Sequence, residues 1–334
     1  MPYARGHRPD PSREEPHGTP SLPCWTSIGP VVVSRRSSGI LAVAITSVLW
    51  GTTGTAATFA PSASPLAIGS AALGIGGLLQ LAVAWRSVTG GRARLAQHRG
   101  VILAAGLAVA VYPLAFYASM HLAGVAIGSV VSLASAPLFS GALEAVIDRH
   151  RPDGRWTAAV VLAVGGGAAL ILSHEVGSGS NVILGVALGL VAGATYALYS
   201  WAARRLMDAG IERAAAMGAV FGLGGLLLMP VLFVTGAPLL ASPQAFAVAA
   251  YMALVPMFLG YLLFGFGLAR VPASTATTVT LLEPAVATLL AVLVVGERLS
   301  AVGWAGMAAI AASLLVLSLP ARAGGPGDRS VPMP

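Results

Sequence analysis

The chain has 334 residues, of which 56% are hydrophobic and only 9% are charged, and its mean hydropathy is +0.82. Because a soluble domain carries about a quarter charged residues, this composition excludes an ordinary soluble enzyme and indicates a polytopic membrane protein. The net charge is +7, but every basic residue is an arginine in a tail or in a short stretch between apolar blocks. That placement is typical of topology signals rather than of a nucleic-acid-binding surface.

Ten apolar blocks follow a polar N-terminal stretch. Residues 1–37 are rich in Pro and Arg and lack hydrophobic periodicity, which predicts a disordered cytoplasmic tail. Each block is about 20 residues long, enough to cross the hydrocarbon core as a helix. We therefore expect an all-α integral membrane protein with ten transmembrane helices, at 39–59, 65–85, 100–120, 124–146, 156–172, 182–202, 214–234, 244–268, 274–295 and 303–319.

The arginines predict the orientation of these helices. If the N-terminus is cytoplasmic, 18 of the 19 arginines fall on the cytoplasmic side, and Arg298 alone falls outside. Cytoplasmic loops carry an excess of Arg and Lys, so we expect both termini, including the tail 320–334, in the cytoplasm.

A shift of 147 places aligns the chain with itself. It lays "LASAPLFSGAL" (133–143) over "TLLEPAVATLL" (280–290), with Pro137 on Pro284. The shift predicts two repeats, 38–173 and 181–319, of five helices each. Because five is odd, the second repeat enters the membrane inverted. Inverted repeats are typical of secondary transporters, whose substrate site lies near the bilayer midplane between the repeats.

Two segments carry a family resemblance. "SVLWGTTGTA" (47–56) resembles the Trp-Gly signature of the first helix of EamA-type carriers in the drug/metabolite transporter (DMT) superfamily, and "LLEPAVATLLAVLVVGERLS" (281–300) resembles part of their closing segment. The resemblance covers residues 39–319. It implies two inverted five-helix repeats, alternating access, and export of amino acids or other small metabolites across the bacterial cytoplasmic (inner) membrane. The repeats differ where Ala136 stands opposite Glu283, and His150 opposite Glu297.

Glu283 is the residue for which the sequence most strongly indicates a functional role. It lies about halfway along the 274–295 span, in a stretch without other charges from Arg270 to Glu297. A carboxylate at the bilayer centre costs at least roughly 2.5 kcal/mol on insertion scales, which disfavours a lipid-facing position. It is expected either to be neutral or to face a wet cavity, where it binds a coupling proton or a substrate amine. A structural hydrogen bond near Pro284 is the alternative interpretation.

Aromatic and hydroxyl side chains at mid-depth are expected to line the same cavity. Trp50 and Thr53 share one helix face, as do Tyr196 and Tyr199, because residues three apart are neighbours on a helix. A role in packing or at the interface is the alternative for each aromatic residue. The complete set predicted to bind substrate or proton is Glu283, Trp50, Thr53, Tyr112, Tyr117, Tyr196, Tyr199 and Tyr261.

Two prolines inside spans are predicted to act as hinges or kinks. Pro137 and Pro284 each remove a backbone hydrogen bond, and Thr277 and Thr280 are expected to satisfy carbonyls freed by Pro284. A simple packing bend is the alternative. Near the end of the fourth span, Glu144 is expected to join an interfacial ion-pair cluster with Asp148, Arg149 and His150.

The sequence predicts no cofactor, no metal site and no enzyme. The glycine runs 74–77, 165–167 and 222–225 lie inside apolar spans without a following Lys-Ser/Thr, so they predict close helix packing rather than a phosphate loop. The expected partners are a small-molecule substrate and the lipid bilayer, with no nucleic acid; a homodimer is left open. The predicted function is secondary transport, with proton coupling left open. A passive facilitator and a non-transporting scaffold or sensor are the alternatives.

Overall fold

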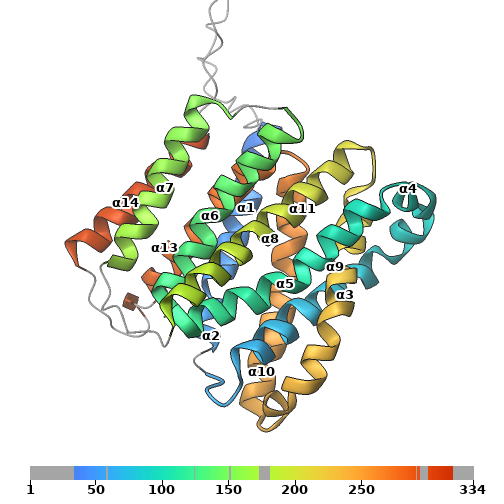
Figure 1. Cartoon of the computed structure of the whole chain (residues 1–334), viewed down its shortest axis with the longest axis horizontal. Helices are drawn as coiled ribbons and strands as arrows, with labels where there is room; N and C mark the ends of the chain where they lie inside the picture. The colour runs from blue at the N-terminus through green and yellow to red at the C-terminus, as the bar shows by residue number, and fades with distance from the viewer. Residues whose placement is uncertain are drawn as a thin grey trace, which may run out of the picture. The chain divides into compact units, whose positions relative to one another are not determined.

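A computed structural model describes residues 34–57, 59–123, 125–149, 152–172, 181–290, 292–293 and 300–318. The predicted tails therefore lie almost entirely outside the described residues, as do His150, Glu297 and Arg298. Within these ranges, every regular element is a helix, as the composition predicted (Figure 1).

The helices follow the predicted spans in order. The first half holds α1 (Arg35–Gly51), α2 (Thr53–Ala57), α3 (Pro65–Gly90), α4 (Arg92–Gln97), α5 (Arg99–Ala123), α6 (Val125–Val146) and α7 (Gly154–Leu172). The second half holds α8 (Val182–Asp208), α9 (Arg213–Thr235), the 3₁₀ turn η1 (Ala237–Leu240), α10 (Pro243–Met252), the π-helix η2 (Ala253–Leu259), α11 (Gly260–Leu268), α12 (Ala273–Val279), α13 (Leu282–Leu290) and α14 (Ala301–Ser318).

Six helices of the described residues are long and apolar enough to cross a membrane. They run over Arg35–Ala57, Pro65–Gly90, Arg99–Ala123, Val182–Asp208, Arg213–Thr235 and Pro243–Leu268; Val131–Val146 and Ala301–Leu317 are shorter apolar helices.

Local capping explains several helix starts. The side chains of Ser34, Ser64, Asn181 and Ser242 each accept a hydrogen bond from a backbone N–H three residues on, which satisfies one of the free donors at a helix N-terminus. The cap at Ser34 makes α1 begin at Arg35, so residues 35–37 are helical where the sequence predicted tail.

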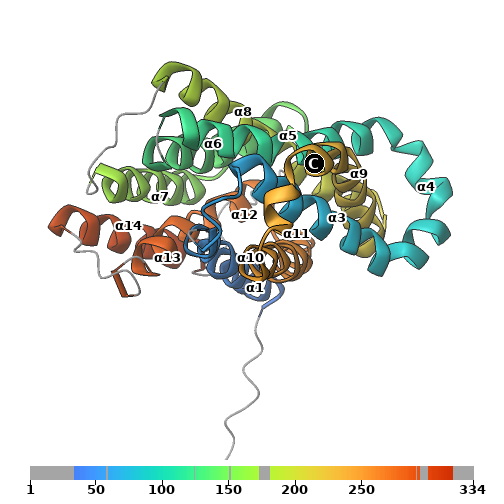
Figure 2. The same ribbon diagram turned by 90° about the horizontal axis from the view of Figure 1, so that it is seen from below.

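Helices that are equivalent under the 147-residue shift pack against each other. α3 packs along α9, α7 along α14, and α6 along α12 (Figure 2). The first of these pairs is antiparallel, because Gly74 lies opposite Gly225 whereas Ala84 lies opposite Gly218. The second is also antiparallel: Gly166 lies beside Gly306, and Arg155 donates to the Val316 carbonyl.

Glycines make the α3–α9 contact close. A Cβ atom on Gly225 would lie 2.7 Å from the carbonyl oxygen of Gly74, and one on Gly218 would lie 2.5 Å from the Cβ of Ala84. The predicted packing role of the runs 74–77 and 222–225 is therefore observed. In the run 165–167, Gly166 alone is in such close contact.

The ninth predicted span is not one continuous helix. α12 ends at Val279, Thr280 and Leu281 form a turn, and α13 begins at Leu282. Pro284 has no N–H to offer the Thr280 carbonyl, which instead accepts from the Glu283 N–H at 2.9 Å. Pro284 thus lies in the first turn of a new helix, where proline is tolerated, whereas Pro137 lies inside the continuous α6.

Candidate functional site

A small cavity lies between the two halves of the chain. Its volume is about 30 Å³, enough for about one water molecule. The lining residues come from α1, α2, α3 and α5 of the first half and from η2, α11 and α13 of the second, and are Trp50, Thr53, Gly69, Ala72, Leu73, Tyr112, Pro113, Phe116, Tyr117, Met257, Tyr261 and Glu283.

The cavity contains one acidic residue, Glu283, in the first turn of α13. Its helix packs closely on α1: a Cβ atom on Gly51 would lie 2.7 Å from the Cβ of Val286. In the described part of the chain, the ion pairs are Arg204–Asp208 and Arg205–Asp148, and neither involves Glu283. The carboxyl group is thus held beside a nearly closed cavity without a neighbouring cation among the described residues.

Aromatic rings line the same cavity as this carboxyl group. The ring centroids of Trp50 and Tyr261 are 4.8 Å apart, and those of Tyr112 and Phe116 are 5.6 Å apart. The ring of Tyr117 lies on the bare backbone of Gly69, where a Cβ atom would be 2.6 Å from the ring. The cavity therefore offers aromatic faces and hydroxyls around a single carboxyl group.

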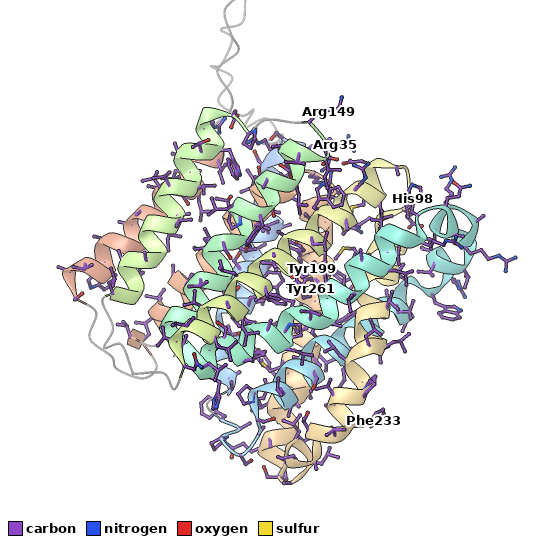
Figure 3. The ribbon with its side chains drawn as sticks, in the orientation of Figure 1. Arg35, His98, Arg149, Tyr199, Phe233 and Tyr261 are labelled. Atoms are coloured by element: carbon purple, nitrogen blue, oxygen red, sulfur yellow. The ribbon has the colours of Figure 1, made fainter. Side chains whose placement is uncertain are left out.

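Tyr196 and Tyr199 pack against residues that line the cavity. Both are fully buried in α8 and do not line the cavity. The hydroxyls of Tyr199 and Tyr261 are hydrogen-bonded at 2.8 Å, near the centre of the helices in Figure 3, and Tyr196 donates to the Thr280 hydroxyl at 2.8 Å. Six of the eight predicted residues thus line one cavity, and the other two brace the helices around it.

The sequence did not predict the π-helix beside the cavity. Pro256 cannot donate a backbone hydrogen bond, and the helix widens over Ala253–Leu259. The carbonyl of Pro256 accepts from the Trp50 indole at 2.9 Å, and that of Phe258 accepts from the buried Gln80 amide at 2.9 Å. Two features of the sequence could have indicated this irregular helix: a proline inside the 244–268 span and a glutamine inside the 65–85 span.

Among the described residues, Glu144 forms no ion pair with Arg149, and His150, the other cation expected in the cluster, lies outside them. The carboxylate is buried, and it accepts from the Ser274 N–H at 2.9 Å and from the Ser274 hydroxyl at 2.5 Å. Asp148 pairs with Arg205 and accepts from the Trp201 indole. The physical reason is that the start of α12 offers unpaired N–H groups beside Glu144, so the side chain binds that helix instead.

The comparisons with known proteins identify the family. The model of the EamA-like transporter family matches residues 37–172 and again residues 183–319. This chain belongs to that family. It is 36% identical over 284 residues to the "Uncharacterized transporter YwfM" of Bacillus subtilis (strain 168), a match that covers 83% of this chain and 93% of that protein.

Two further similarities concern part of the sequence and the fold. An "Uncharacterized transporter" of Clostridium kluyveri is 30% identical over 124 residues, covering 36% of this chain and 39% of that protein. A solved structure, "Crystal structure of protein", has a TM-score of 0.67 at 18% identity and covers 84% of this chain and 96% of its own. At that identity the similarity shows the fold alone.

The resemblance found in the sequence is confirmed, and this EamA-like protein is a multi-pass membrane transporter built from two EamA repeats. The family is a transporter family rather than an enzyme family, and its partners are the lipid bilayer and a small-molecule substrate. Among the described residues, no group of three or more His, Cys, Asp or Glu side chains could hold a metal ion. The cavity draws its lining from both matched segments, with Trp50 in the first and Glu283 in the second.

Proposed function

We propose that this chain is a secondary exporter of small metabolites that carry an amine, such as amino acids, with Glu283 as the group that binds the coupling proton and the substrate ammonium in turn. The observation that carries the proposal is a carboxyl group facing an aromatic cavity between the repeats. An ammonium ion is attracted by a carboxylate and by the faces of Trp and Tyr rings.

The antiparallel packing of α3 with α9 and of α7 with α14 supports ten membrane-spanning helices in two inverted five-helix repeats. In such carriers a site between the repeats is exposed to each side in turn. The cavity of about 30 Å³ is about a tenth of the roughly 300 Å³ that small-molecule pockets usually offer. We therefore assign this conformation to a closed step of the cycle, which must widen to admit a metabolite.

The orientation we propose places both termini in the cytoplasm of a bacterium, with the arginine-rich helix ends on that side. In Figure 3, Arg35 and Arg149 lie at the top of the helices and His98 at the upper right, whereas Phe233, at the other end of α9 from Arg213, lies at the lower right. The positive-inside rule supports this assignment. Export then means movement from the edge with Arg35 and Arg149 toward the edge with Phe233.

The test is transport by purified protein in proteoliposomes that hold a trapped pH indicator. A panel of amino acids and amines is offered to the wild type and to Glu283→Gln, which keeps the side-chain shape but cannot exchange a proton. We expect substrate-dependent proton flux in the wild type, and its loss in the variant together with a fall in transport of roughly tenfold or more, since a hydrogen bond to a charged group is worth about that factor.

Glu212→Gln is the matched control, because Glu212 is exposed before α9 and its side chain caps no backbone N–H. Its transport should equal that of the wild type. Full and still pH-dependent transport by Glu283→Gln would remove Glu283 from the mechanism.

A further inference from the structure

A second buried carboxylate joins two helices at the arginine-rich end of the bundle. Glu144 lies near the end of α6 and is 7% exposed. Both of its oxygens accept hydrogen bonds from Ser274, at the start of α12. Hydrogen bonds to an ionised group are short and strong, so these two contacts hold α6 against α12 where α12 begins.

This contact lies nearer the arginine-rich end of the bundle than the cavity does. Glu283 follows Ser274 by nine residues in the chain, which corresponds to a depth of about 13 Å at the rise of a helix. At the same end, Arg204 donates to the carbonyls of Leu268 and Val271, and so ties α8 to the turn before α12. α6, α8 and α12 therefore meet between the arginine-rich edge and the cavity.

Two buried hydroxyls lie one helical turn inward from these contacts. Ser140 and Ser200 are fully buried, and neither hydroxyl has a hydrogen-bond partner in the part of the chain that the structure describes. Ser140 lies one turn before Glu144 on α6, and Ser200 lies one turn before Arg204 on α8, so each hydroxyl shares the helix face that carries the contact to the start of α12. Buried polar groups normally have a partner, so two unpaired hydroxyls, each one turn inward from a contact to α12, point to a second state in which water reaches them.

The other end of the bundle has no equivalent contact in its sequence. Under the 147-residue shift, Glu144 corresponds to Ala291 and Ser274 to Ile127. An apolar pair cannot form the same hydrogen bonds. The Glu144–Ser274 contact is therefore a feature of one side of the transporter and is not shared by the two repeats.

From these observations we infer that Glu144 is a gating residue: its bonds to Ser274 keep the arginine-rich side closed, and their release opens a hydroxyl-lined path past Ser140 and Ser200 to the cavity. The inference rests on the proposed alternating-access function. It is independent of whether Glu283 carries a proton, because it concerns only access to the cavity from one side.

The test uses thiol accessibility and needs no substrate. Cys24 is the only cysteine of the chain, so Cys24→Ser gives a cysteine-free background. In that background, Ser140→Cys reports on the path, and a membrane-impermeant maleimide is added from the arginine-rich side. We expect Glu144→Ala to speed labelling by roughly tenfold or more, the factor that one hydrogen bond to a charged group provides, and Glu212→Ala to leave it unchanged.

Ser119→Cys distinguishes a local opening from general loosening. Ser119 is fully buried in α5 and donates to the Gly185 carbonyl, away from the gate. Labelling of Ser119→Cys should stay slow both in the background that retains Glu144 and in the background with Glu144→Ala. Equal labelling of Ser140→Cys with and without Glu144, or equal acceleration at both reporter positions, would overturn the gate.

Cross-linking gives a second readout. Glu144→Cys with Ser274→Cys is treated with a short reagent that forms a disulfide with each cysteine, and counterflow exchange is measured before cross-linking, after it and after reduction. We expect exchange to stop on cross-linking and to return on reduction, whereas Glu144→Cys with Ile147→Cys, which links two positions of one helix end, should exchange at the same rate before and after cross-linking. Full exchange by the cross-linked α6–α12 pair would contradict the gate. This outcome does not depend on whether Glu283→Gln changes transport, so the gating proposal and the proposal for Glu283 can fail independently.

Discussion

Glu283 and Glu144 are two carboxyl groups in helical, apolar surroundings, and their partners differ. Glu144 has both oxygens bonded to Ser274, which offsets the cost of burying its charge. Glu283 faces the cavity, and the ion pairs of the described residues lie elsewhere. A group without such compensation is the one whose charge changes most readily when its surroundings change, which is why we place proton exchange at Glu283 and gating at Glu144.

Trp50 is predicted to support the structure as well as line the cavity. Its indole donates to the Pro256 carbonyl in the π-helix. Trp50→Phe keeps an aromatic ring but leaves that buried carbonyl without its donor, at a cost of about 1–3 kcal/mol. We expect a lower midpoint of thermal unfolding in detergent, followed by circular dichroism.

Trp85→Phe is the control for this substitution, because Trp85 is 59% exposed on α3. Its unfolding midpoint should match that of the wild type. Equal midpoints for both variants would mean that the indole–carbonyl bond does not stabilise the π-helix.

At the scale of the elements, the two prolines that are equivalent under the 147-residue shift have different effects on their helices. Pro137 lies within the continuous helix α6, whereas Pro284 lies in the first turn of α13, after a break at Thr280 and Leu281. The break is stabilised by Thr280, whose hydroxyl donates to the Thr277 carbonyl and accepts from Tyr196. The second repeat therefore has an interrupted helix beside the cavity, a feature that secondary transporters use at their binding sites.

The α3–α9 contact predicts a steric effect of one methyl group. Gly225→Ala places a Cβ atom 2.7 Å from the Gly74 carbonyl oxygen, and overpacking of this kind costs roughly 1–3 kcal/mol. Gly167→Ala is the matched variant, since a Cβ atom there meets no described atom within 4 Å. Thermal unfolding should show a lower midpoint for Gly225→Ala alone; a shift of the same size in both variants would contradict the steric explanation.

Much of this arrangement was predictable from the sequence because hydrophobic length and internal repetition are strong signals. Both signals can be seen in the order of residues along the chain. The structure has helices within all ten predicted spans, and Trp50, Tyr112 and Glu283, which were predicted to share a cavity, line the same one. The π-helix and the bond from Glu144 to Ser274 were not predictable. They depend on which helices become neighbours in the folded chain, and no local pattern specifies that.

For the whole molecule, the proposed orientation gives a prediction about the two faces. In the cysteine-free background, Gln97→Cys lies in the exposed α4 among arginines, and Ala241→Cys lies exposed beyond α9 at the opposite end. We expect an impermeant maleimide to label Ala241→Cys in right-side-out vesicles and Gln97→Cys in inside-out vesicles. The reverse pattern would invert the topology and with it the direction that we call export.

The lack of a second carboxyl group at Ala136, the repeat equivalent of Glu283, has a consequence for energetics. In each half of the proposed alternating-access cycle, the single carboxylate carries either one proton or one substrate ammonium group. If the substrate is a monovalent amine cation, this exchange moves no net charge across the bilayer; if it is a zwitterionic amino acid, the exchange moves one positive charge per cycle. Amine export would then draw its energy from the difference in proton concentration alone, whereas the membrane voltage would also drive the export of amino acids.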